Sequence, residues 1–414
     1  MRPTACLFAI FCVFSVVHAQ EGDVRGVHDP SIIKDGEFYY IYTTSLPNEL
    51  GMPVRRSRDL FNWKVVGDVF ETFPKWVADR NPQHRNLWAP HVAKWDGTFH
   101  LYYSVSDFGT NRSALALATN ETLDVMSDRY SWKDMGPVIT TEPGRDDWNA
   151  IDPCIAEDSS GNPWLILGSY WQGVKGMKLD KRTGKLSADR KIYDLASRHG
   201  GPIEAPYVVK HNGFYYLFVS FDHCCKGVDS DYKTMVGRSR NLMGPYVDCE
   251  GTDMNDGGGS LVLSGVGNVI GPGHNSVLEE NGGDWFVHHY YDASHNGVPT
   301  LQIRPLHWLP SGWPVVGEPI SGPLTKNNDR TFVMPGVWEH RVNYENVGHR
   351  IRFEANHTLA GGAAKWKLSG NQLTMQWRKP DGEWIDTCVL ASDGASYVGR
   401  NQAGAVISGK RITP

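Results

Sequence analysis

The sequence predicts an all-β protein, with a five-bladed β-propeller followed by a small, barrel-like all-β domain at the C-terminus. A strand start that contains Pro or Asn is followed by a turn and an aromatic strand, and this unit recurs five times. The second halves of the units begin at Phe38, Phe99, Pro163, Phe214 and Trp285. A period of about 50 to 70 residues is typical of a propeller in which each repeat is one blade.

The strands are predicted from short apolar runs that are bounded by turns. Within the repeats the turns read KDGEF, WDGTF, SSGNPW, HNGF and NGGDW, and no amphipathic helix of ten or more residues is expected. We predict the propeller over residues 20–320 and a linker over 321–330, with the sequence SGPLTKNNDR. Residues 331–414 alternate short strands with Asp-Gly and Ala-Gly turns, which predicts the second domain. That domain contains few candidate catalytic groups, so capping of the propeller is favoured over sugar binding.

The first residues predict a secretory signal peptide over 1–19. Arg2 precedes an apolar stretch from Ala5 to Val17, and Val17-His18-Ala19 has the small residues of a cleavage site. The apolar stretch is too short to span a bilayer. We therefore expect a secreted, extracellular protein that is not held in a membrane.

Charge and aromatic content limit the classes of partner that the protein is expected to bind. The chain has 414 residues and a formal net charge of −5 without a long run of one sign, which argues against nucleic acid as a partner. We expect a monomer. The 15 Trp and 17 Tyr residues suit stacking on sugar rings, although most are expected in the cores of the blades.

Five cysteines remain after removal of the signal peptide. They are Cys154, Cys224, Cys225, Cys249 and Cys388. Their spacing fits no zinc motif, and the odd number predicts at least one free thiol or an intermolecular link. We expect at most two disulfides and no catalytic thiol.

Ionisable residues recur at one place in the repeat. Asp29, Asp152 and His274 each lie three residues before the apolar residue that continues the strand, and Glu204 lies four residues before Val208. If these segments are the inner strands of their blades, the side chains converge on one end of the central channel. An Asp-Pro pair alone more often only starts a strand, but several carboxylates at one phase of a repeat are more specific.

Two of these carboxyl groups could supply the acid and the base that hydrolysis of a glycosidic bond requires, and a third could tune the pKa of the acid. Inversion needs a general base and a general acid about 6.5–9.5 Å apart. Asp29, on rigid backbone, suits the base, and Glu204, with its longer reach, suits the acid. Asp152 would raise the pKa of Glu204 by like-charge repulsion or accept bonds from substrate hydroxyls. His274 could contact substrate or bind an axial metal, and the sequence itself does not point to calcium.

The motifs HDPSII, NLWAPHV, NAIDPCI, GGPIEAPYV and GPGHNSV resemble glycoside hydrolase family 43 over residues 24 to 320. The Asn-Arg-Ser and Cys-Cys-Lys-Gly segments resemble its endo-1,5-α-L-arabinanase branch. The resemblance implies Asp29 as base, Asp152 as pKa modulator and Glu204 as acid. It also implies a metal, usually calcium, near His274, held largely through water. The implied substrate-binding residues are His28, Trp88, Phe108, Asn149 and Ser169.

The function that this resemblance implies is cleavage of internal α-1,5-L-arabinofuranosidic bonds in arabinan, a pectin side chain. The nearest alternative is an exo-acting enzyme on the same scaffold, an α-L-arabinofuranosidase, exo-arabinanase or β-xylosidase. A non-catalytic propeller lectin would not need three carboxylates at matching phases. A retaining glycosidase would need its two carboxyl groups only about 5–5.5 Å apart.

Overall fold

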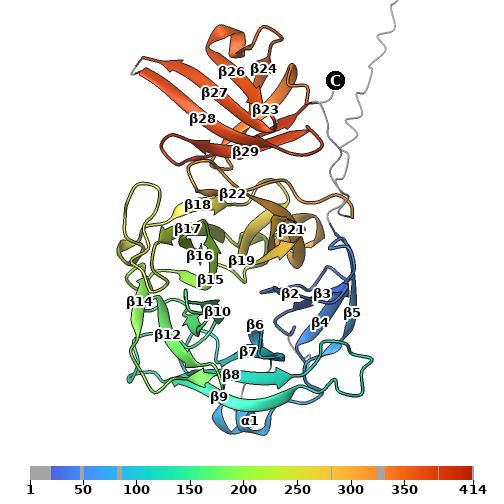
Figure 1. The fold of residues 1–414 in the computed structure, drawn as a ribbon, viewed down its shortest axis with the longest axis vertical. Coiled ribbons are helices and arrows are strands. Elements are labelled where there is room, and N and C mark those ends of the chain that lie inside the picture. The colour runs from blue at the N-terminus through green and yellow to red at the C-terminus, as the bar shows by residue number, and fades with distance from the viewer. Residues whose placement is uncertain are drawn as a thin grey trace, which may run out of the picture.

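The computed structural model describes residues 20–46, 51–81, 86–280, 282–323, 332–380 and 382–412. Five antiparallel sheets surround an axis, and a closed barrel follows them (Figure 1). The predicted fold class is therefore confirmed. The predicted signal peptide lies outside the described residues, as does most of the predicted linker.

The first three blades each begin with the strand that lies nearest the axis. Blade one consists of β2 (Ser31–Asp35), β3 (Phe38–Tyr42), β4 (Pro53–Ser57) and β5 (Asn62–Asp68), with β1 (Glu21–Gly22) added parallel to β5. Blade two consists of β6 (Trp88–Trp95), β7 (Thr98–Ser106), β8 (Ser113–Asn120) and β9 (Lys133–Thr141). Blade three consists of β10 (Cys154–Glu157), β11 (Pro163–Leu167), β12 (Val174–Asp180), β13 (Lys185–Leu186) and β14 (Tyr193–Ala196).

The last two blades have four strands each. Blade four consists of β15 (Ile203–His211), β16 (Phe214–Phe221), β17 (Lys233–Ser239) and β18 (Ser260–Leu263). Blade five consists of β19 (Val269–Glu280), β20 (Gly283–Asp292), β21 (Val298–Trp308) and β22 (Pro314–Val316). The helical segments are short: α1 (Lys75–Arg80), η1 (Gly227–Asp229), η2 (Met254–Asp256), η3 (Ala293–His295) and η4 (Ala360–Gly362).

The five inner strands form a closed ring. β2 contacts β6, β6 contacts β10, β10 contacts β15, β15 contacts β19, and β19 returns to β2 (Figure 1). The interpretation of the HDPSII-type segments as inner strands is thus confirmed. Groups at the start of these strands come from distant parts of the sequence and meet at one end of the ring.

The chain closes the ring with hydrogen bonds between its first and last blades. Val27 N donates to Pro299 O at 3.1 Å, and Leu301 N donates to Val24 O at 2.8 Å. The Gln20 side chain adds a further contact, because Ile303 N donates to its Oε1 at 3.0 Å. Residues 20–27 therefore hold blade five against blade one, beside the start of β2.

The apolar core of the propeller is divided into layers between neighbouring blades. One cluster joins blades one and two through residues such as Tyr42, Val54 and Leu101. Equivalent clusters fill the other four boundaries. Most aromatic residues belong to these layers, as the sequence predicted, and their burial fixes the relative positions of the blades.

The C-terminal domain is a closed barrel with an aromatic interior. Its strands are β23 (Gly336–Val342), β24 (His349–Phe353), β25 (Thr358–Leu359), β26 (Ala364–Ser369), β27 (Gln372–Lys379), β28 (Gly382–Leu390), β29 (Ser396–Asn401) and β30 (Val406–Arg411). It packs on the edges of blades four and five. There the buried Arg400 donates to Leu261 O at 2.7 Å, and Tyr344 Oη donates to Val262 O at 2.9 Å.

Within the described ranges, none of the helices has the length and apolarity needed to cross a bilayer.

Candidate active site

Each inner strand is preceded or interrupted by one residue with left-handed backbone. The φ values are +52° at Asp29, +43° at Ala89, +59° at Asp152, +55° at Ala205 and +47° at His274. The first four residues precede a proline, which disfavours the right-handed helical conformation at that position. Asp tolerates left-handed backbone better than most residues. The same bend therefore recurs in all five blades, and it aims the side chains at the axis.

The backbone N–H of each bent residue donates to a side chain of the preceding blade. In four blades the acceptor belongs to the second strand of that blade or to the residues just after it. The bonds are Asp29 N to His289 Nδ1 (3.1 Å), Ala89 N to Thr44 Oγ1 (2.8 Å), Asp152 N to Ser104 Oγ (3.1 Å) and His274 N to Ser220 Oγ (2.9 Å).

Blade four departs from this pattern. Ala205 N donates instead to Asp152 Oδ2 of blade three at 3.1 Å. Ser169, which follows the second strand of blade three, donates to Glu204 Oε2 at 2.8 Å. This change of partners hydrogen-bonds the predicted acid Glu204 to Ser169. It also places Asp152 beside Ala205, the residue that follows Glu204.

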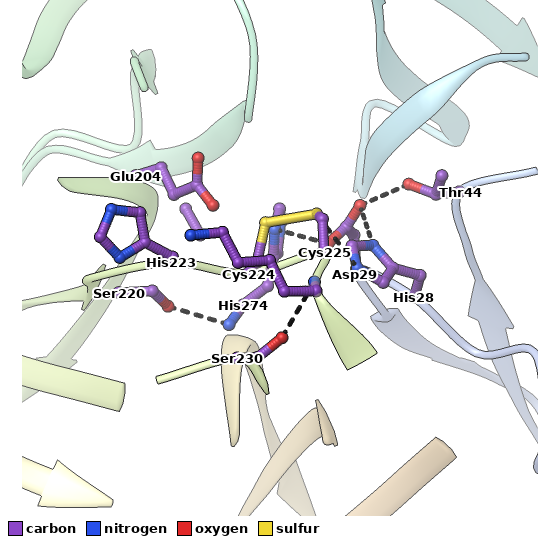
Figure 2. Close-up of a disulfide and its surroundings, with 12 residues drawn as sticks. His28, Asp29, Thr44, Glu204, Ser220, His223, Cys224, Cys225, Ser230 and His274 are labelled. Atoms are coloured by element: carbon purple, nitrogen blue, oxygen red, sulfur yellow. Dashed lines mark hydrogen bonds and ion pairs between the residues drawn. A yellow bond between two sulfur atoms is a disulfide. The ribbon is translucent and has the colours of Figure 1, made fainter. Parts of the chain in front are cut away.

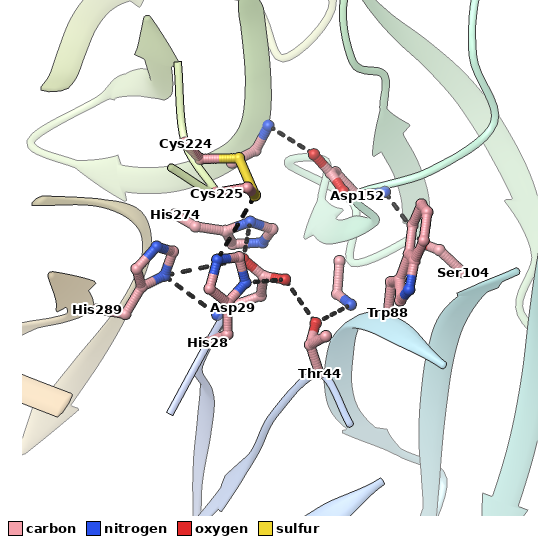
Figure 3. A network of polar contacts seen from close by, with 12 residues as sticks. His28, Asp29, Thr44, Trp88, Ser104, Asp152, Cys224, Cys225, His274 and His289 are labelled. Carbon is pink, nitrogen blue, oxygen red and sulfur yellow. Dashed lines mark hydrogen bonds and ion pairs between the residues drawn. A yellow bond between two sulfur atoms is a disulfide. The ribbon is translucent and has the colours of Figure 1, made fainter. Parts of the chain in front are cut away.

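Asp29 is buried and surrounded by polar groups. Its Oδ2 accepts from Thr44 Oγ1 at 2.5 Å and lies 2.8 Å from His28 Nδ1, and its Oδ1 lies 2.9 Å from His274 Nδ1 (Figure 3). Burial would raise the pKa of Asp29, but the charges and hydrogen bonds of His274 and His28 hold this pKa well below its usual range. The carboxylate of Asp29 is therefore ionised.

The other two carboxyl groups show the opposite behaviour. Burial raises the pKa of Asp152 to about 8, and the charges of Glu204 and Asp29 act in the same direction. Burial also raises the pKa of Glu204, against hydrogen bonds from Tyr232 and Ser169 that lower it. Two environments are thus present at one end of the channel: one keeps a carboxylate charged, and one favours a protonated carboxylic acid.

The two histidines beside Asp29 on β19 and β20, His274 and His289, differ in charge. Burial would lower the pKa of His274, but the charge of Asp29 and their hydrogen bond raise it to about 9. Burial lowers the pKa of His289 well below its usual range. His289 Nδ1 accepts the Asp29 N–H as a neutral imidazole, and its ring stacks on His28 with centroids 4.1 Å apart.

The structure gives the five predicted substrate-binding residues different surroundings. Trp88 is half-buried, and Phe108 is 82% exposed with its ring 6.4 Å from that of Trp88. Both are available to a sugar. Asn149 is buried and accepts from Ser113 Oγ at 2.6 Å. Ser169 and His28 lie against Glu204 and Asp29, so their observed contacts are with the predicted acid and base.

Several residues of the site were not predicted from the sequence. They are Thr44, Ser104, Ser220, Tyr232, His289 and Tyr291. A signal was present for four of them, because Thr44, Ser104, Ser220 and His289 lie four to six residues after the start of the second half of their repeat, as Ser169 does. The motifs TTS, SVS, GSY and VSF repeat a hydroxyl there, but Ser and Thr near a strand end are common in loops as well.

The channel also contains groups that suit a cation. Among the described residues, His28, Asp29 and His289 have ligand atoms close enough to share a metal. His274 uses Nδ1 for Asp29, which leaves Nε2 as its remaining ligand atom. Next to it, the buried Asn275 carboxamide has neither its oxygen nor its nitrogen hydrogen-bonded. An imidazole nitrogen and an unpaired amide oxygen fit a weakly held cation that takes its other ligands from water.

An ionised carboxylate and a protonated carboxylic acid, supplied by different blades of a propeller, are the groups of a glycoside hydrolase site. Comparison with known proteins indicates the same class of enzyme. The family model described as glycosyl hydrolases family 43 matches residues 24–314. The chain belongs to this family.

Relatives within the family include enzymes of two kinds. The chain is 43% identical over 291 residues to the extracellular endo-α-(1→5)-L-arabinanase 1 of Bacillus subtilis, a match that covers 70% of this chain and 87% of that protein. It is 39% identical over 322 residues to the extracellular exo-α-(1→5)-L-arabinofuranosidase ArbA of Cellvibrio japonicus, covering 75% and 91%. A solved structure of Cellvibrio cellulosa α-L-arabinanase complexed with arabinohexaose matches with a TM-score of 0.67 and 39% identity, covering 70% and 95%.

Replacement of Ser169 by Ala should lower kcat about tenfold or more. The Ser169 hydroxyl donates to Glu204 and stabilises the carboxylate that forms as the acid gives up its proton, and bonds to charged groups contribute about 1.5–3 kcal/mol. Steady-state kinetics would measure the effect. Ser104→Ala is the matched control, because it removes a hydroxyl whose bond is to the backbone N–H of Asp152. If both variants lost kcat equally, Ser169 would have no special relation to Glu204.

Proposed function

We propose that this protein is a secreted, inverting glycoside hydrolase that cleaves internal α-1,5-L-arabinofuranosidic bonds in arabinan. The observation that carries the proposal is the difference between the carboxyl groups. Asp29 is held ionised by His28 and His274, whereas burial raises the pKa of Glu204 and Asp152. A base and an acid that coexist near neutral pH are what hydrolysis with inversion requires.

In this proposal Asp29 is the general base and Glu204 the general acid. Asp29 takes a proton from a water molecule as the oxygen of that water attacks the anomeric carbon. The glycosidic bond breaks, and Glu204 gives its proton to the leaving oxygen. Asp152 and Glu204 are buried together, so like-charge repulsion keeps a proton on the pair, and Asp152 also orients substrate hydroxyls. Trp88 and the exposed Phe108 offer ring faces to sugars, with Asn149, Ser169 and His28 deeper in the site.

The substrate is proposed from the relatives. Two relatives that each match 70% or more of this chain are named as acting on α-(1→5)-L-arabinose linkages, one as an endo-enzyme and one as an exo-enzyme. The endo-enzyme has the higher identity, 43% against 39%. Exo action on the same linkage is therefore the second candidate. The names of both relatives include the word extracellular, which, with the predicted signal peptide, supports secretion. We also propose that the protein acts as a monomer.

We further propose that a calcium ion binds near His274, with most of its ligands supplied by water. His274 Nε2 and Asn275 Oδ1 would be the protein ligands, and the unpaired Asn275 carboxamide supports this placement. Binding of the ion to Nε2 would release the proton of that nitrogen, and His274 would keep its Nδ1 proton for Asp29. When bound, the ion supplies positive charge beside three buried carboxyl groups.

Replacement of Glu204 by Gln should reduce the rate on linear arabinan about 10²–10⁴-fold while binding is retained, because general-acid assistance is lost. Rates should recover in large part on an arabino-oligosaccharide with a nitrophenyl leaving group, which departs without a proton. Initial rates and calorimetric binding would measure both effects. Glu157→Gln, at an exposed position in β10, is the matched control. A Glu204→Gln variant that cleaved arabinan at the parental rate would exclude Glu204 as the acid.

Time-resolved product analysis separates the two candidate modes. Endo action on debranched linear arabinan predicts mixed oligomers in the first samples and a rapid fall in chain length. Size-resolved chromatography of the products would show this distribution. Arabinose as the sole product from the first time point would establish the exo mode and end the endo proposal.

Removal of calcium should lower both thermal stability and activity, and added CaCl₂ should restore them. Elemental analysis of the dialysed protein should find about one calcium per chain, with less in Asn275→Ala. Asn346→Ala, at an exposed position in the barrel domain, is the control and should retain the metal. Protein that held no calcium above the level in the buffer would contradict the site.

A further inference from the structure

Two adjacent cysteines form a disulfide at the end of the channel that carries Asp29. The Cys224–Cys225 bond lies in the segment between β16 and β17, and Cys225 is exposed (Figure 2). In the described part of the chain, the other three cysteines are free. The expectations of at most two disulfides and of at least one free thiol are met, but pairing of neighbours was not foreseen. A disulfide between neighbours closes a small ring and holds the local backbone directly.

The disulfide segment of blade four is connected to blades five and one. Cys225 N donates to Tyr291 Oη of β20 at 2.7 Å. Tyr291 Oη lies 2.9 Å from His28 Nε2, and Cys225 Sγ lies 3.8 Å from the same nitrogen. His28 Nδ1 then lies 2.8 Å from Asp29 Oδ2. Four groups thus form a continuous path from the disulfide to the proposed base.

The direction of the first bond limits the directions of the others. An amide N–H can only donate, so the Tyr291 oxygen accepts from Cys225. We assign the Tyr291 proton to His28 Nε2, because Ser230 Oγ, the other neighbour of this hydroxyl, already accepts from Lys226 N. His28 then carries its proton on Nδ1, which lies 2.8 Å from Asp29 Oδ2 as an ion-pair contact. The tautomer of His28 whose Nδ1 proton faces Asp29 is therefore favoured by the position of the Cys225 amide.

The backbone at Cys225 needs a restraint to stay in this position. Its φ is +67°, a left-handed conformation that is unfavourable for a residue with a side chain. The flanking bonds, from His223 N to Asp231 Oδ1 (2.8 Å) and from Lys226 N to Ser230 Oγ (3.0 Å), fix the ends of the segment and not the Cys225 amide. The covalent ring supplies the restraint at that residue.

We propose that the Cys224–Cys225 disulfide and Tyr291 are positioning elements for the catalytic base. The disulfide holds the Cys225 amide on the Tyr291 hydroxyl, and that hydroxyl orients His28 so that its Nδ1 proton faces Asp29. The inference depends on the proposed role of Asp29 as base. It predicts that cutting the path at the disulfide or at Tyr291 slows the chemical step and leaves substrate binding nearly unchanged.

The test combines reduction with Tyr291→Phe in one cycle. A phosphine reduces the disulfide: the phosphine and one water give phosphine oxide, and the two sulfurs take two electrons and two protons to become thiols. Intact-mass analysis after alkylation confirms the state of Cys224 and Cys225. Reduction of the parent should lower kcat on linear arabinan about tenfold with KM within twofold. Tyr291→Phe should show the same loss, and its reduction should add less than twofold, because both changes cut one path.

Tyr290→Phe is the matched control. Tyr290 is adjacent on β20 and its side chain points to the opposite face of the strand, so this variant should keep the parental rate and the parental response to reduction. Three results would overturn the proposal: a reduced parent with unchanged kcat, an increase confined to KM, or a full tenfold further loss when Tyr291→Phe is reduced. If reduction unfolds the protein, the kcat of Tyr291→Phe alone decides, and a parental value overturns the proposal.

A second readout does not need a substrate. Nitrogen-15 spectra of the histidine side chains report the hydrogen bond at His28 Nε2, whose signal should move on reduction of the parent and stay in place on reduction of Tyr291→Phe. A signal that reduction leaves unmoved in the parent contradicts the link. A parent that does not cleave arabinan would refute the proposed function, while this spectroscopic result would still decide whether the disulfide positions His28.

Discussion

Burial of three carboxyl groups at one end of the channel is the constraint that shapes the rest of the site. Asp29, Asp152 and Glu204 are each more than 90% buried, and an unpartnered buried charge is very costly. Asp29 is surrounded by Thr44, His28 and His274, and its charge is retained. Asp152 and Glu204 have fewer partners, and burial raises their pKa values. The chemical difference between base and acid thus arises from unequal solvation of similar groups.

The propeller supplies these partners through a repeated contact between blades. In four of the five blades the N–H of the bent residue donates to a hydroxyl or an imidazole of the preceding blade. Between blades three and four the acceptor is a carboxyl oxygen of Asp152 instead, and Ser169 donates to Glu204. One exchange of partners in an otherwise regular ring is enough to convert a structural contact into a contact with the proposed acid.

The fold and the three acidic residues could be predicted from the sequence because both follow from periodicity. The repeated strand pairs predicted five blades, and the common phase of Asp29, Asp152 and His274 predicted a shared location. The hydroxyl partners were missed because Ser and Thr near strand ends are too common to be specific. Tyr291 and the Cys224–Cys225 disulfide could not be predicted, since their roles depend on which blades meet across the axis and on a left-handed backbone at Cys225. Phe108 and Trp88, which were predicted to bind substrate, lie close together, and Phe108 is exposed while Trp88 is half-buried.

In the proposed mechanism Asp29 acts on water while Glu204 protonates the leaving oxygen in a single displacement. The stereochemistry of the first product tests this most directly. Proton NMR of arabinan hydrolysis, recorded before mutarotation, should show the β-anomer of the newly formed reducing end. First appearance of the α-anomer would mean retention of configuration through a covalent intermediate, which would contradict the assignment of Asp29 as a base.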